Sequence, residues 1–179
     1  MAERETLSLE LPGSWPAAAD AEVGHWLAAM DDARVDTLKE LEGRVTDDLL
    51  EAVPDEDLNS IGTIFYHVAL VEVDWILTDL LGKAAPIWPA DLLPYGDRDR
   101  DGRLTEVRGE TLAQHLDRLA AGRAVVREHL GPMSNEDFHR LRPREEWDVT
   151  AAWILHHLLQ HEAEHRDHIA WVRDRLLRA

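Results

Sequence analysis

The chain has 179 residues, which is enough for one sizeable core, so we predict a single domain over residues 1–179. The formal net charge is −17, from 36 acidic and 19 basic residues, and no basic stripe is visible; this argues against nucleic-acid binding. There is no cysteine, which excludes disulfides, iron–sulfur clusters and catalysis by a protein thiol.

The N-terminal segment 1–11 has neither a basic region nor an apolar stretch, so it is not expected to be a signal peptide. No apolar run approaches the ~20 residues that a membrane-spanning helix needs. We therefore expect a cytoplasmic protein with no membrane partner.

Apolar residues at three- and four-residue steps predict four helices, over residues 20–45, 59–81, 109–130 and 149–177. Arg34 interrupts the apolar stripe of the first helix, and we expect it to be ion-paired or to extend to solvent. The second helix is apolar on nearly all sides and is expected at the centre, with Asn59 or Ser60 as its cap and Gly82 at its end. No segment alternates with period two, so no strand is expected. The pattern predicts an all-α protein, a four-helix bundle.

The longest connection covers residues 83–103, and it contains three prolines, two glycines and the charge run Asp97 to Asp101. Proline and glycine at this density stop both helix and strand. About twenty residues is long for a connection in a bundle. We expect it to be a crossover along the bundle rather than a lid. A second connection covers residues 133–148.

The fourth helix carries five histidines, and four of them, His157, His161, His165 and His168, lie at steps of four, four and three. They share one face with Trp153 and other apolar residues, so we expect this face to point inward. Buried imidazoles are costly unless they are hydrogen-bonded or metal-bound. Two histidines at i and i+4 bring their nitrogens close enough to bind one ion. The face therefore predicts a metal site.

A third ligand is needed, and His67 is the best candidate because it lies midway along the apolar second helix, on a face that also carries Asp74. His168 is the alternative, although it would confine the site to a single helix. The metal set predicted is His67, His161 and His165. Three histidines suit a divalent transition metal, with zinc first and nickel or iron as alternatives.

Two other metal chemistries match parts of this pattern. The string His161-Glu162-x-x-His165 matches the pattern of zinc peptidases, in which the glutamate is the base, but few residues follow it to supply a third ligand. A di-iron site needs inward-facing glutamates on several helices, and none is expected on the second or third helix.

Two segments give the sequence a family resemblance. Ser60-Ile-Gly-Thr-Ile-Phe-Tyr-His67 and Trp153-Ile-Leu-His-His-Leu-Leu-Gln-His161-Glu-Ala-Glu-His165-Arg166 resemble the metal-binding segments of the DinB-like (DinB/YfiT-like) superfamily of metalloenzymes. The likeness extends over about residues 20–177. Where this family usually continues His-Arg-Gly-Gln-Ile, this chain has His165-Arg166-Asp167-His168-Ile169, which leaves the roles of His168 and of His157 open.

The resemblance implies an up-down-down-up four-helix bundle with three histidine ligands and open metal positions. Characterised members of this superfamily are often transferases or isomerases that use a low-molecular-weight thiol such as bacillithiol or mycothiol. The resemblance also makes a homodimer a reasonable expectation.

These observations favour a metal-dependent S-transferase or isomerase that acts on a small-molecule substrate with a thiol or water bound at the metal. Asp74 and Glu162 are the candidate catalytic residues, with Asp74 preferred because it shares the face of His67. The alternatives are a metal-dependent hydrolase with Glu162 as base, and a bundle that binds metal or a small ligand without catalysis.

Overall fold

The computed structural model describes residues 17–41, 43–55, 58–83 and 88–178. The segment 1–11, for which no signal peptide was predicted, and Pro86 of the long connection lie outside the described residues.

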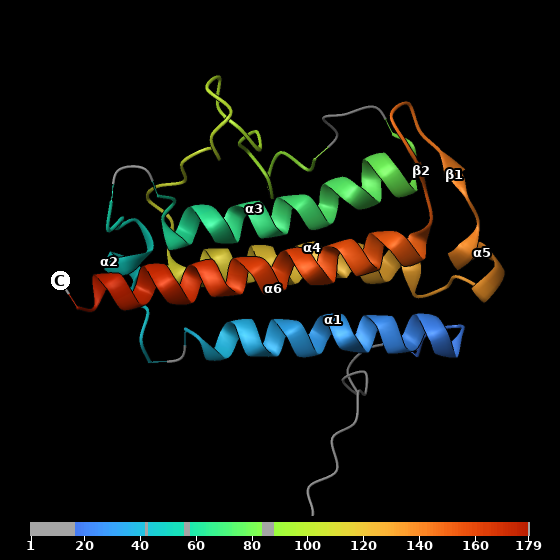
Figure 1. The fold of residues 1–179 in the computed structure, drawn as a ribbon, viewed down its shortest axis with the longest axis horizontal. Helices are drawn as coiled ribbons and strands as arrows, with labels where there is room; N and C mark the ends of the chain where they lie inside the picture. The colour runs from blue at the N-terminus through green and yellow to red at the C-terminus, as the bar shows by residue number, and fades with distance from the viewer. Residues whose placement is uncertain (1–16, 42, 56–57, 84–87, 179) are drawn as a thin grey trace, which may run out of the picture.

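Within the described residues, four long helical segments lie side by side (Figure 1): α1 (Ala21–Lys39), α3 (Ile61–Asp74) with its π-helical continuation η1 (Trp75–Leu80), α4 (Leu112–Leu130) and α6 (Ala151–Leu176). The short helices α2 (Asp47–Leu50) and α5 (Asn135–His139) lie in the connections. Helices α1 and α6 run in one direction, and α3 and α4 run in the other (Figure 1). The predicted all-α fold is confirmed.

Hydroxyl and carboxylate side chains cap the N-termini of the long helices. Ser60 accepts a hydrogen bond from the backbone of Thr63 at the start of α3, and Thr150 accepts one from Trp153 at the start of α6. Thr111 and Gln114 form a reciprocal capping box at the start of α4. Each cap satisfies a backbone N–H that has no partner within the helix.

The first helix is shorter than predicted. It ends at Lys39 rather than at Val45, and the chain then turns through Gly43, whose φ of 65° favours glycine. Leu41 and Val45 nevertheless remain buried after the turn, so they continue the apolar pattern without continuing the helix.

The prediction that the chain has no strand is wrong. Two-residue strands β1 (Arg142–Pro143) and β2 (Asp148–Val149) pair antiparallel in the connection before α6. Strands this short carry no alternating pattern that a sequence could display.

The long connection is a crossover, as predicted. Because α3 and α4 run in the same direction, the chain returns along α3 before α4 begins (Figure 1). The Tyr66 hydroxyl on α3 donates to the carbonyl of Tyr95 (2.7 Å) and accepts from its N–H (2.8 Å). Arg118 on α4 donates to the carbonyl of Leu92 (2.9 Å). These bonds fix the connection against the helices.

A buried ion-pair network divides the core. It consists of Arg34 on α1, Glu72 on α3, Arg123 on α4 and Glu162 on α6, all buried. Along the chain, each network residue lies between residues of two apolar clusters, one around Phe138 and the other around Phe65. We name this set the arginine–glutamate network.

The contacts in the arginine–glutamate network join all four long helices. Arg34 Nε lies 2.5 Å from Glu162 Oε1, and Arg34 Nη2 lies 3.0 Å from Glu72 Oε1. Arg123 Nη2 lies 2.6 Å from Glu72 Oε1 and 2.7 Å from Glu162 Oε2. The expectation that Arg34 is ion-paired is thus met. The expectation of no inward glutamate on the second helix is wrong, because Glu72 faces the core there.

Residues Ile61–Leu80 form a helix that is long and apolar enough to cross a membrane, by length and composition alone. The statement that no apolar run approached this length is therefore wrong. The most apolar window of this helix is 78% buried inside the structure, as expected for the central helix of a helical core.

Candidate metal centre

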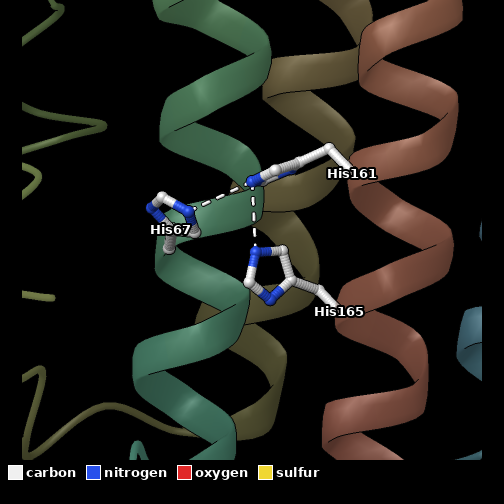
Figure 2. A group of neighbouring side chains, drawn as sticks. All are labelled: His67, His161 and His165. Atoms are coloured by element: carbon white, nitrogen blue, oxygen red, sulfur yellow. Dashed lines mark hydrogen bonds between the residues drawn. The ribbon is translucent and has the colours of Figure 1, made fainter.

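Three histidines from two helices converge on one point. His67 comes from α3, and His161 and His165 come from successive turns of α6 (Figure 2). His161 Nε2 lies 3.1 Å from His67 Nε2 and 3.1 Å from His165 Nε2. Within the described chain, this is the one group of three potential ligands whose atoms all lie within 4.8 Å of one another. We name it the histidine triad.

The register of α6 places the histidine triad at the rim of the core. Ile154, Leu158 and Glu162 are buried, whereas His157, His161 and His165 are partly exposed. Each buried position is offset by one residue from a histidine position, and one residue corresponds to a rotation of about 100° around a helix. The expected inward direction of the histidine face is therefore only partly right, and Trp153 on that face is 48% exposed.

The spacing of the histidine triad fits a metal ion. A zinc–nitrogen bond of about 2.0–2.1 Å in tetrahedral geometry puts ligand nitrogens about 3.3 Å apart. The two measured Nε2–Nε2 distances, 3.1 Å each, are close to this value. The donor set of three imidazoles suits zinc, nickel, iron or copper.

The surroundings keep two of these imidazoles in the neutral form that binds metals. Burial, followed by the neighbouring His165 and His67, lowers the pKa of His161 to about 2. Burial, followed by His67 and His168, lowers the pKa of His165 to about 4. Neutral imidazole is the form that offers a lone pair to a metal.

A carboxylate orients the third ligand. His67 Nδ1 lies 2.6 Å from Asp97 Oδ1, which leaves Nε2 directed at the other two histidines. Burial acts to raise the pKa of Asp97, but the hydrogen bond from His67 and the positive charge of Arg98 hold it below its usual value. A carboxylate behind a ligand histidine fixes its tautomer and increases its basicity.

The histidine triad opens into a cavity of about 530 Å³. Asp74 and Trp75 line this cavity from α3 and η1, and Asp97 and Arg98 line it from the long connection. Asp74 Oδ1 accepts a hydrogen bond from Trp88 Nε1 (3.0 Å). Burial raises the pKa of Asp74, and the hydrogen bond from Trp88 opposes this shift.

Comparison with known proteins identifies the family. The sequence model of the mycothiol-S-transferase family matches residues 26–177 of this chain. The chain belongs to the mycothiol-S-transferase family. This family is DinB/YfiT-like, so the resemblance seen in the sequence is confirmed.

A solved structure shares the fold. The crystal structure of a conserved protein from Enterococcus faecalis aligns with a TM-score of 0.63, covering 86% of this chain and 96% of that chain. Its sequence is 17% identical, so the likeness concerns the fold alone. No curated protein sequence matches this chain.

In this member of the mycothiol-S-transferase family, two further histidines of α6 flank the triad. His168 is exposed, with its ring centroid 5.4 Å from that of His165, and it is not part of the group of converging ligand atoms. His157 lies 5.9 Å from His161 between ring centroids and packs against Trp75 and Trp153. Both line the cavity.

Glu162 points away from the triad and into the arginine–glutamate network. It is 1% exposed, and both carboxylate oxygens are paired with guanidinium groups. Burial acts to raise the pKa of Glu162, but Arg34 and Arg123 together hold it below its usual value. A carboxylate held ionised and enclosed in this way is poorly placed to take a proton at the metal, so the geometry argues against the predicted role of Glu162 as a base.

Two site residues were not singled out from the sequence. Asp97 was noted only as part of a charge run, and its approach to His67 depends on the path of the crossover. Trp75 lies in the second helix, which is apolar on nearly all sides, so no spacing distinguishes it there. The one sequence signal for Asp97 is its place in an otherwise solvent-facing loop that has to return along the helix of His67.

Proposed function

We propose that this protein is a metal-dependent S-transferase in which His67, His161 and His165 bind one divalent transition metal, with zinc as the first candidate and nickel or iron as alternatives. The co-substrate is a low-molecular-weight thiol, with mycothiol first because the family bears that name. The single observation that carries the proposal is the convergence of three histidines, whose ligand nitrogens all lie within 4.8 Å of one another, on an open cavity. We further propose a single cytoplasmic domain that acts on a small molecule and forms a homodimer.

A divalent metal held by His67, His161 and His165 would supply positive charge that lowers the pKa of a bound thiol. His161 and His165 remain neutral and therefore do not cancel that charge. Asp97 holds His67 in the tautomer that presents Nε2 to the site. The cavity leaves room for both the thiol and an acceptor.

Asp74 is the proposed acceptor of the thiol proton. It lines the cavity on the same helix as His67, and burial raises its pKa toward the range useful for proton transfer. In the overall reaction the thiol sulfur forms a bond to an electrophilic carbon. The leaving group departs with its bonding electron pair, and the proton passes from the thiol to Asp74 and then to solvent.

The hydrolase alternative loses its proposed base, because Glu162 lies in the arginine–glutamate network. Only a measurement of turnover distinguishes the S-transferase from a bundle that binds metal without catalysis. The test below addresses that difference directly.

The test uses tag-free protein loaded in turn with zinc, nickel or ferrous ion, and mixed with mycothiol and 1-chloro-2,4-dinitrobenzene. We expect thioether product, measured by mass spectrometry, to form faster than without protein. His161→Ala should abolish this rate. His156→Ala, on the same helix but exposed and packed against Trp26, should retain it. No thiol consumption with any metal, or an unchanged rate in His161→Ala, would contradict the proposal.

A further inference from the structure

Aromatic rings continue from the histidine triad along α6 and onto its neighbours. The Trp153 ring stacks on His157, with centroids 5.2 Å apart and planes 4° apart. Trp75 lies 4.5 Å from His157 and 5.2 Å from Trp153. Trp147 stacks on Trp75 at 6.0 Å and 20°. We name this set of four residues the aromatic wall.

The aromatic wall begins at the cavity and is open to solvent at its far side. Trp75 and His157 line the cavity of the histidine triad. Trp153 and Trp147 are 48% and 47% exposed. Burial of the apolar area of a tryptophan is strongly stabilising. Two indoles that remain half exposed beside a cavity therefore mark a binding surface.

The exposed rings are held in place by buried groups. Trp147 Nε1 donates to Asp79 Oδ1 (2.8 Å), and Asp79 is 8% exposed. Arg144, in the same hairpin, donates to the carbonyls of Asp79 (2.6 Å) and Leu80 (2.9 Å) at the end of η1. The hairpin of β1 and β2 is thereby anchored to the segment that carries Trp75. A surface fixed in this way needs little ordering when a ligand binds.

The π-helical turn contributes to this arrangement. Trp75 is the first residue of η1 and follows Asp74 directly. A π-helical turn inside an α-helix shifts the directions of the side chains that follow, and such turns are frequent at functional sites. Here the turn begins where α3 meets the cavity.

The charges around the aromatic wall disfavour an anionic ligand. Asp74 lies at this end of the cavity, and the exposed Glu145 and Glu146 precede Trp147 in the hairpin. Among the described residues that line the cavity, Arg98 is the one arginine or lysine, and its Nε lies 3.3 Å from Asp97 Oδ2. The wall itself therefore offers π faces, and the one arginine of the cavity is already paired with Asp97.

We propose that the aromatic wall binds the acceptor substrate of the S-transfer reaction and selects a planar, uncharged aromatic ring. This inference rests on the proposed function and specifies the chemical class of its acceptor. The ring stacks on Trp153 and Trp75, and the electrophilic carbon that it carries faces the histidine triad. The new bond is sulfur to carbon, and the bond that breaks is carbon to leaving group, which departs with the electron pair.

The test is direct binding without thiol, so it does not depend on turnover. Metal-loaded protein is titrated with nitrobenzene and, separately, with nitrocyclohexane, which has an apolar ring but no π face. We expect Trp153→Ala and Trp75→Ala to weaken nitrobenzene binding by about two- to tenfold, as the loss of one aromatic contact does. Trp171→Ala is the matched control, because Trp171 lies on the same helix as Trp153 and is 45% exposed but is not part of the aromatic wall.

Equal affinity for nitrobenzene in wild type and both wall variants overturns the proposal. So does an equal loss in Trp171→Ala, or binding of nitrocyclohexane as tight as that of nitrobenzene. If nitrobenzene binding depends on the wall but no thiol is consumed, the wall stands as an aromatic-ligand site and the S-transferase function fails. If thiol is consumed but nitrobenzene affinity does not depend on the wall residues, the inference about the acceptor fails and the S-transferase function stands.

Discussion

His67 on α3 and Asp97 in the crossover are joined by a 2.6 Å contact between Nδ1 and Oδ1. The contact ties the long connection to the helix that supplies one of the three converging imidazoles. It explains why a loop of this length is fixed at its middle. It also makes the crossover part of the site.

Removal of the Asp97 carboxylate should weaken metal binding without unfolding the protein. We expect Asp97→Ala to lower metal affinity by about 10- to 100-fold, because the imidazole of His67 loses its orienting partner. Competition with a chromogenic chelator measures this affinity. Asp101→Ala, an exposed residue of the same loop, is the control and should bind metal as wild type does. Wild-type affinity in Asp97→Ala would show that the carboxylate does not support the metal site.

Asp74 should affect turnover rather than metal content. Asp74 is the proposed proton acceptor, so Asp74→Asn should lower kcat/KM for the conjugation reaction by about 10²-fold or more. The metal content of the variant, measured on the same sample, should stay at the wild-type value. A rate within twofold of wild type would remove Asp74 from the mechanism.

Glu162 should affect stability. Glu162→Ala leaves Arg34 and Arg123 without one of their buried partners, and the loss of one member of a buried ion pair costs about 3–5 kcal/mol. Urea denaturation measures the change in the free energy of unfolding. Glu164→Ala, exposed on the same helix, is the control. A Glu162→Ala protein of unchanged stability but without activity would restore the role of Glu162 as a base.

The metal-free protein should lose stability as the pH falls below about 6.5. The unfolded chain binds protons at its histidines near that pH. The folded state does not, because burial and neighbouring imidazoles lower the pKa of His165 to about 4 and of His161 to about 2. Above about 6.5 both states are neutral at these positions, so they contribute no slope there.

Chemical denaturation of chelator-treated protein between pH 7.5 and pH 4.5 measures this dependence. The double variant His161→Gln/His165→Gln should show a shallower decline than wild type. Parallel declines in the two proteins would mean that these imidazoles do not titrate as their environment implies.

The triad could be predicted from sequence because helix geometry alone brings His161 and His165 together, and the apolar character of α3 places His67 opposite a neighbouring helix. The helix starts were predicted to within three residues from apolar spacing, and Ser60, one of the two caps proposed for the second helix, is the observed cap. These features depend on local spacing.

The rest of the site depends on contacts between segments that are far apart in the sequence. Asp97 reaches His67 across 30 positions, and Glu162 meets Arg34 across 128. The string around Glu162 matches a peptidase motif locally, yet a rotation of about 100° from His161 turns its side chain into the core. Periodicity assigns a face to a residue, and only the packing of the other helices decides which charges meet there.

The most direct test of the account is the metal content of tag-free protein, measured by mass spectrometry, in wild type, His67→Ala, His161→Ala and His165→Ala, with His156→Ala as control. The account predicts about one equivalent of a transition metal in wild type and in the control, and its loss in the three triad variants. A wild-type protein that holds no metal and takes none up on reloading, or a His67→Ala protein that keeps its metal, would contradict it.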